Sequence, residues 1–234
     1  MTREIDQKVV QMELPAKAAQ ICAEMRAYWE ALRMGRQVPA RSDIDPRGIE
    51  RALEYAFIIE RVAPGMGRFR LAGMHLNDLM GMEVRGMPLT AMFAPKGRKK
   101  VAEATEAAFQ NPAIVELDLV AETGIGKPPL KGKLLILPLK SDLGDISRAL
   151  GCFVAEGASM GRTPRRFEVA AARIMPIETG KPTQTKEPVR PAQLGFAEDA
   201  PTFAAPPRRP AAPIAPTQDT PEERRAMFRI VTND

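Results

Sequence analysis

The sequence predicts an α+β domain built around a small curved sheet. Two short apolar runs, residues 55–62 and 68–72, flank a turn that contains Gly65 and Gly67, and short helical segments follow them. Residues 114–121 alternate apolar and polar side chains, which is the pattern of a half-buried strand. A hairpin followed by short helices differs from the βαβ unit of nucleotide-binding proteins. This arrangement suits a module that senses or docks better than one that catalyses.

Length and composition indicate one domain with a tail. The chain has 234 residues, of which 44% are hydrophobic and 27% are charged, so it can bury one ordinary core and has material left over. Residues 1–6 are charged, and no apolar run approaches the roughly 18 to 20 residues that a membrane helix needs. We therefore expect a soluble cytoplasmic protein without a signal peptide or a membrane span.

Charge and cysteine usage exclude further classes. The net charge of +5 comes from 34 basic and 29 acidic residues that are interspersed, which indicates a mixed solvated surface and argues against a nucleic-acid partner. Only 5% of the residues are aromatic, which is few for a base-stacking platform. Cys22 and Cys152 lack metal or redox spacing, so we predict two isolated, buried thiols without a disulfide.

Residues 15–35 form the clearest predicted helix. Apolar side chains recur there at the spacing of one helical stripe, with Pro15 at the start and Gly35 at the end. A tryptophan on such a stripe packs against a sheet or a partner helix more often than it serves a cofactor. The stripe consists of Ile21, Cys22, Met25, Tyr28, Trp29 and Leu32.

The next segments alternate short helices with the first strands. Asp45 before Pro46 predicts a helix start, because the carboxylate can accept unpaired backbone N–H groups. Phe57 and Ile59 alternate with Ile58, so both faces of the sheet are partly apolar and something must cover the outer face. The predicted helices after these strands lie at residues 74–80, ended by Gly81, and at residues 95–109.

Three further strands complete the predicted sheet. The loop at residues 124–129 lacks the spacing of a phosphate loop and joins strand to strand, so we predict no ATP site there. All five predicted strands lie at residues 55–62, 68–72, 114–121, 130–139 and 146–155.

The composition changes after residue 175. Proline becomes frequent and periodic apolar patterns end, which predicts an extended, disordered linker over residues 176–219. Residues 220–234 begin with a capping box and carry apolar anchors, so they form a candidate docking helix. These docking candidates are Met227, Phe228, Ile230 and Val231. The predicted segments are an extension (1–14), the amphipathic helix (15–36), the sheet domain (37–175), the linker (176–219) and the docking helix (220–234).

Four short motifs stand out along the chain: Tyr28-Trp29, residues 39–46 (PARSDIDP), residues 69–73 (FRLAG) and residues 81–86 (GMEVRG). With these motifs and this order of elements, the chain resembles a PAS domain and, more narrowly, the PAS-like family of short alphaproteobacterial regulatory proteins. The resemblance covers about residues 15–160. It implies a five-stranded antiparallel sheet with helices on one side, acting in motility, cell-cycle or stress signalling. The proline-rich tail lies outside it.

PAS domains can hold haem, flavin or small metabolites between sheet and helices. A haem would need an axial ligand, and the only histidine, His75, follows the second strand instead of lying on the long helix. A covalent flavin adduct would need a cysteine in the short-helix region, and Cys22 and Cys152 lie elsewhere. We therefore predict no cofactor and leave a small metabolite open. With one histidine and no kinase or cyclase signature, we predict that the protein is not an enzyme.

The favoured hypothesis is a non-enzymatic signalling module that binds proteins and forms a homodimer through its N-terminal helix and sheet. The interface candidates are Met25, Trp29, Leu32, Ile58 and Phe153.

Two alternatives stay open. One is a small-molecule receptor with a pocket between sheet and helices, with Phe57, Leu71, Met80, Met87, Phe93, Leu117 and Val154 as candidates. The other is a weak nucleic-acid or cyclic-nucleotide binder that uses residues 96–100 with Arg162, Arg165 and Arg166.

Overall fold

The structure is a computed structural model that describes residues 16–179. The predicted N-terminal extension, almost all of the predicted linker and the docking candidates Met227, Phe228, Ile230 and Val231 lie outside these residues. The helices, with η for 3-10 helices, are α1 (Ala16–Arg33), η1 (Arg41–Asp43), η2 (Pro46–Tyr55), α2 (Met74–Met80), η3 (Leu89–Met92) and α3 (Pro95–Gln110). The strands are β1 (Ala56–Ala63), β2 (Met66–Ala72), β3 (Ala113–Ala121), β4 (Lys131–Leu139), β5 (Arg148–Glu156) and β6 (Phe167–Pro176).

One antiparallel sheet carries the fold. Its strand order is β2-β1-β5-β4-β3-β6, and every pair of neighbours is antiparallel. The α+β class and the antiparallel sheet are thus confirmed, and β1 to β5 match the five predicted strands within two residues at each end.

The predicted number of five strands is wrong, because β6 adds a sixth at the free edge of β3. Most β6 side chains are exposed, and three consecutive alanines occupy its centre at positions 170–172. Small exposed residues give neither the alternation nor the apolar run by which a strand is recognised in a sequence.

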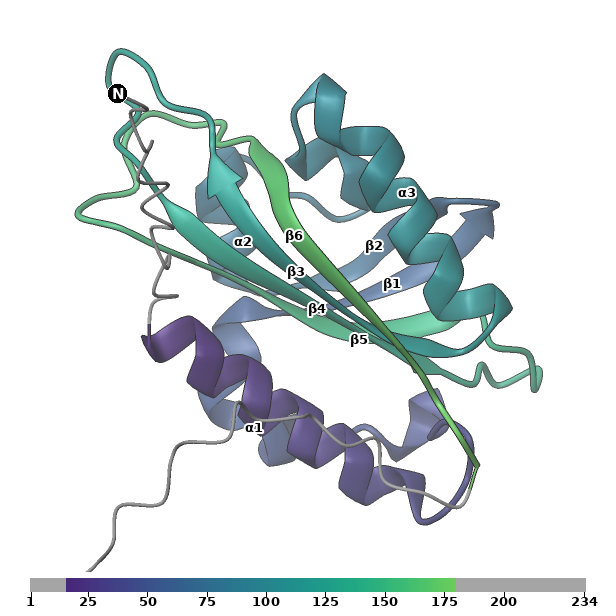
Figure 1. Ribbon diagram of the computed structural model, residues 1–234. Coiled ribbons are helices and arrows are strands. Elements are labelled where there is room, and N and C mark those ends of the chain that lie inside the picture. The colour runs from purple at the N-terminus through teal and green to yellow at the C-terminus, as the bar shows by residue number, and fades with distance from the viewer. Residues whose placement is uncertain (1–15, 180–234) are drawn as a thin grey trace, which may run out of the picture. The chain divides into compact units, whose positions relative to one another are not determined.

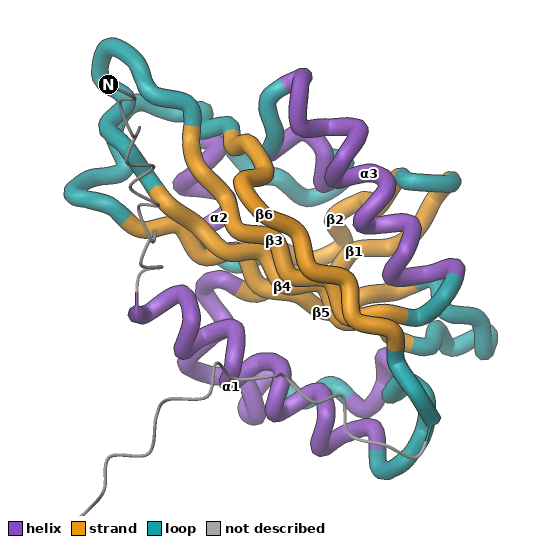
Figure 2. The backbone as a smooth tube through the Cα atoms, in the orientation of Figure 1, coloured by secondary structure: helices purple, strands orange, loops and turns teal. Residues whose placement is uncertain are grey.

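Helices lie on both faces of the sheet, as Figures 1 and 2 show. We call the face towards α2 and α3 the inner face and the face towards α1 the outer face. Each face has its own buried apolar cluster. The outer face, which the sequence indicates must be covered, is covered by α1 and η2.

Glycine is required where β5 crosses the ring of Phe57. A Cβ atom on Gly151 would lie 2.4 Å from that ring and 2.3 Å from the carbonyl oxygen of Leu135. The neighbours of Gly151 on the inner face are Ala149 and Phe153, which both belong to the inner cluster. The glycine therefore lets β1, β4 and β5 pack closely at the centre of the sheet.

Local capping follows the predictions. Asp45 accepts a hydrogen bond from the backbone N–H of Arg47 at 3.0 Å, and this caps η2. Gly81 ends α2 with a φ of 71°, a left-handed conformation that glycine adopts without a steric penalty. No helix within residues 16–179 is both long and apolar enough to cross a bilayer.

The last turn of α1 holds the end of the described chain. Arg33 is almost fully buried, and its guanidinium donates a hydrogen bond of 2.9 Å to the carbonyl oxygen of Glu178, just beyond β6. The same guanidinium donates to the carboxylate of Glu30 and lies 5.4 Å from the ring of Trp29. Since Arg26 of α1 also contacts Sδ of Met175 in β6 at 3.6 Å, the first helix is joined to the end of the last strand at two places.

Candidate functional site

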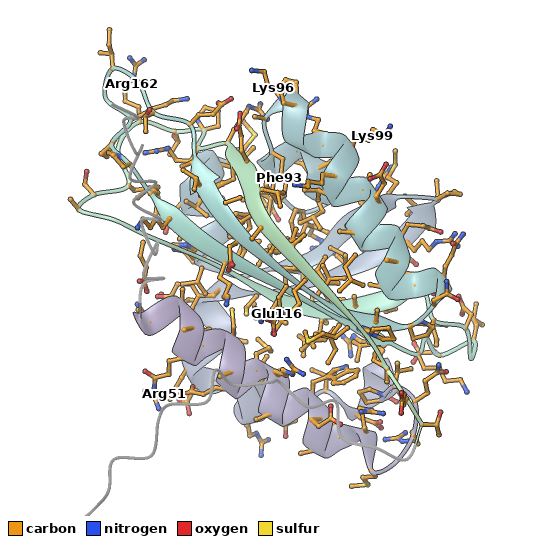
Figure 3. All side chains as sticks on the ribbon, viewed as in Figure 1. Arg51, Phe93, Lys96, Lys99, Glu116 and Arg162 are labelled. Carbon is orange, nitrogen blue, oxygen red and sulfur yellow. The ribbon has the colours of Figure 1, made fainter. Side chains whose placement is uncertain are left out.

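The interior between the inner face and α3 is filled by aromatic side chains. Phe93 and Phe153 stack with ring centroids 6.2 Å apart, and Phe153 meets Phe167 edge to face at 4.9 Å. Phe57 and Phe69 make a third contact at 5.5 Å. Figure 3 shows Phe93 within this layer. The space in which a PAS pocket was predicted is thus occupied by the chain's own rings.

The predicted pocket residues divide between three places. Phe57, Met80, Phe93 and Leu117 lie buried in the inner cluster, with Met87 packed against it. Leu71 is 51% exposed and lines a surface groove with Ile58, and Val154 belongs to the outer cluster. The prediction that all seven residues line one pocket between sheet and helices is therefore wrong for Leu71 and Val154.

The predicted interface residues are mostly used inside the chain. Met25, Trp29 and Ile58 are buried in the outer cluster, and Leu32 is half-buried. Trp29 donates a hydrogen bond of 2.9 Å from its indole Nε1 to the carbonyl oxygen of Pro138. Homodimerisation through α1 and the sheet stays a prediction, and it would need surface other than these buried side chains.

Phe153 was assigned to the wrong face. It points into the inner cluster, while its neighbours Cys152 and Val154 belong to the outer cluster. Successive side chains of a strand point to opposite faces. The prediction therefore placed both residues on the wrong face: Phe153 at the interface and Val154 in the pocket.

An apolar groove opens where α1 leaves the outer face uncovered. We define it as the cavity of about 260 Å³ between η2 and strands β1 and β2. Leu53 on η2 is 47% exposed and Leu71 on β2 is 51% exposed. Its side-chain lining is apolar except for Arg41 and includes Ile44, Pro46, Ile49, Leu53, Ile58 and Leu71.

Arg41 is the cationic residue among those that line the groove. Its backbone N–H donates to the carbonyl oxygen of Lys140 at 2.8 Å, so the backbone of a second cationic residue is adjacent. The nearby carboxylate of Asp43 is already engaged, because it accepts from the backbone N–H of Ala40 at 3.0 Å and from Arg36 at 2.7 Å. These contacts lower the pKa of Asp43, the Ala40 contact most.

The sequence does not predict the groove. Its one available signal was the placement of Ile44 and Leu53 on either side of Pro46, in a segment too short to bury both. That signal does not indicate which element the segment will contact, because η2 and β2 come together only in the folded chain.

A second cavity, of about 550 Å³, has a lining of both polar and apolar residues and lies beside His75, Tyr55 and Glu156. The backbone N–H of Ala155 donates to Nε2 of His75 at 3.1 Å, and burial lowers the pKa of His75 below its usual 6.5. Oε1 of Glu156 is buried and has no hydrogen-bond partner among the residues that the structure describes. Lys17 lies over the Tyr55 ring at 4.9 Å and also lines the cavity.

The predicted basic cluster is only partly at the surface. Arg165 is fully buried and donates hydrogen bonds to the carbonyl oxygens of Met160, Glu122 and Pro128. Arg166 donates to the carbonyl oxygen of Ala91 at 2.6 Å. Including Arg165 in an anion-binding surface was therefore wrong, because its guanidinium holds loops together.

Exposed cations do remain near the start of α3. Lys96 and Lys99 project from that helix and Arg162 from the loop before β6, as Figure 3 shows. None of these three has a carboxylate contact shorter than the 4.0 Å between Lys99 and Glu103 in the described part of the chain.

The two thiols are buried but not isolated. Sγ of Cys22 on α1 lies 3.5 Å from Sγ of Cys152 on β5, and both cysteines are free. The contact with Cys22 and burial raise the pKa of Cys152. Neither cysteine lies between β2 and α3, where the resemblance would place a flavin-reactive thiol. Residues 16–179 contain no group of three or more side chains suited to hold a metal ion.

Comparison with known families identifies the class of protein. The PAS domain family model matches residues 18–154, more than half of the chain, and the chain therefore belongs to the PAS domain family. PAS domains are generally signalling and sensing modules. The match ends before β6, so the sixth strand lies outside the region that the family model describes.

Solved structures show a more distant likeness. One comes from work on a flavin analogue and the light-oxygen-voltage domain mechanism, with 15% identity, a TM-score of 0.36 and coverage of 48% of this chain and 84% of that chain. The light state structure of the blue-light photoreceptor Aureochrome1 LOV has 12% identity, a TM-score of 0.34 and coverage of 48% and 88%. Similarity at this level assigns no ligand to the chain. Comparison with curated proteins found no match.

Proposed function

We propose that this chain is a non-enzymatic PAS-type signalling protein that binds other proteins in a bacterial regulatory circuit, such as one that controls motility, the cell cycle or stress. The observation that supports this most is the filled inner layer, in which Phe93, Phe153 and Phe167 pack ring against ring. With the space between sheet and helices occupied, the surface is the place where binding can change the state of the protein. Output by contact then needs no bond-making residue.

Two measurements on the purified full chain test this proposal. Native mass spectrometry should detect no stoichiometric non-protein mass, and such a mass would favour the receptor function considered below over this proposal. An affinity purification should then give a partner that rebinds the chain when both are pure, with a tagged protein of similar charge as the control. A catalytic turnover that copurifies with the chain through several columns would refute the non-enzymatic role.

The cavity beside His75 supports a second candidate function, a receptor for a small polar molecule. The unpartnered Oε1 of Glu156 could accept a hydrogen bond from such a molecule, and Lys17 could pair with an anionic group on it. Thermal shift measurements with a set of amino acids and organic amines would test this role. A ligand should raise the melting temperature of the wild type and leave that of Glu156→Leu unchanged, because leucine removes the acceptor, while no shift with any compound would remove this candidate.

A further inference from the structure

We propose that the apolar groove binds an amphipathic helix of a partner protein, with an acidic residue of that helix next to Arg41. This inference rests on the proposed function, because it names the surface and the chemistry of the partner. The groove lies beside η2, where Leu53, Ile58 and Leu71 line it, and Phe57 of the inner cluster forms part of its wall.

The apolar side chains of the groove are available to a partner. Leu53 and Leu71 leave about half of their surface exposed on its two sides. Its floor contains Ile49 and Ile58, which are already buried by their own chain. A partner that places two or three apolar side chains between Leu53 and Leu71 would remove this exposed surface from water.

The hydrogen bonds of β2 favour a helix over an added strand. β2 is the last strand on its side of the sheet, and an edge strand can in principle accept another strand. Here the middle of that edge is already used, because Phe69 donates its N–H to Met87 at 2.9 Å and accepts from Gly86 at 2.8 Å. A helix needs no backbone pairing with the sheet and can lie in the groove by its side chains alone.

Charge selects an acidic partner. Arg41 lines the groove and makes no ion pair with a carboxylate among residues 16–179, and Lys140 lies next to it. The acidic groups nearby have other roles: Asp43 pairs with Arg36, and Asp45 caps η2. On the η2 side, Glu54 lies 3.9 Å from Lys17. An Asp or Glu near the end of the bound helix would therefore meet an uncompensated cation.

A peptide library selected against the full chain tests the proposal. The probe is a displayed library of random helical peptides about four turns long, and the enriched peptide is then synthesised and its affinity measured by fluorescence anisotropy. We expect apolar residues spaced three or four apart with an Asp or Glu beside them. Leu71→Glu should weaken binding at least about tenfold, because it places a carboxylate in an apolar contact.

Matched variants separate the groove from general effects. Ile125→Glu changes another large apolar side chain, which is 95% exposed in the loop between β3 and β4, and it should leave the affinity unchanged. Arg41→Glu should weaken binding, and a peptide whose acidic residue is replaced by lysine should regain affinity for that variant. Circular dichroism of each variant confirms that it is folded, and Leu53→Gln provides a milder change on the opposite side of the groove.

Several results would overturn the proposal. These are the absence of any enriched sequence, binding that Leu71→Glu leaves unchanged, and an enriched peptide without an acidic residue. A mass change on Leu71→Glu in light scattering would identify a second copy as the occupant, and displacement of the selected peptide by a synthetic peptide of residues 220–234 would identify a segment of the chain itself. Partners that bind wild type and Leu71→Glu equally would refute the groove and leave the signalling function intact.

Discussion

At the scale of single residues, Trp29 fixes α1 on the sheet. Its ring is fully buried and its Nε1 donates to Pro138. Trp29→Ala should lower the free energy of unfolding by about 3–5 kcal/mol through the cavity it leaves. Trp29→Phe should lower it by about 1–3 kcal/mol, because the Pro138 carbonyl loses its buried donor. Urea denaturation measures both, with Ile125→Ala, at a side chain that is 95% exposed, as the control. Equal stability of wild type and Trp29→Ala would contradict this packing.

His75 should titrate below pH 6.5. It is the only histidine in the chain, so its ring protons give a single set of NMR signals. Burial lowers its pKa, and Ala155 donates to Nε2, which leaves the proton of the neutral ring on Nδ1. The stability that depends on the neutral ring is present above pH 6.5 and is lost as the pH falls through the lowered pKa. A titration midpoint at or above 6.5 would contradict the buried position.

At the scale of elements, Glu106 on α3 joins that helix to the hairpin of β1 and β2. Its carboxylate accepts two hydrogen bonds from Arg61, at 2.5 and 3.0 Å, and one from the N–H of Gly65 at 2.7 Å. The Arg61 contact lowers the pKa of Glu106 below its usual 4.5, and the Gly65 contact adds to this effect.

This junction predicts an acid dependence of stability. Because the folded chain holds the carboxylate ionised, its contribution is present above pH 4.5 and is lost as the pH falls through the lowered pKa. Glu106→Gln should cost about 1–2 kcal/mol at neutral pH and should weaken the pH dependence in the acid range. Urea denaturation at several pH values measures both effects. A variant whose stability falls with acid as steeply as that of the wild type would disprove the role of Glu106.

The contact between Cys22 and Cys152 reports on the docking of α1. A disulfide reagent that releases a coloured thiolate should label these buried thiols at least about 100-fold more slowly in the folded chain than in urea. Met25→Ala should speed labelling in the folded chain because it weakens the packing of α1, whereas Ala27→Ser on the exposed side of the helix should not. Rapid labelling of the wild type would mean that α1 leaves the sheet readily.

The same elements show what a sequence can and cannot predict. In β3, the charged Glu116 and Asp118 alternate with Leu117 and Leu119, so the sequence alone indicates that the two leucines face the core. In β5, residues 149–155 contain no polar side chain, and nothing local says which of Phe153 and Val154 points inward. The groove was also beyond prediction, because it depends on where η2 meets β2 and not on either segment alone.

At the scale of the sheet, hydrogen exchange should follow the strand order. β4 and β5 lie in the middle of the sheet with both faces buried, while the exposed side chains of β6 leave its pairing with β3 open to water. Mass spectrometry should find the slowest exchange in peptides of β4 and β5 and faster exchange across residues 168–175. Equal protection of β6 and β4 would mean that β6 is covered by something else.

The bond from Arg33 to Glu178 has a mechanical consequence. It connects α1 directly to the place where the chain continues beyond β6. Tension applied to the chain beyond β6 would act first on the hydrogen bond between Arg33 and Glu178, and only afterwards on the hydrogen bonds between β6 and β3. A partner that pulls on that side could therefore shift the first helix while most of the sheet keeps its strand pairing.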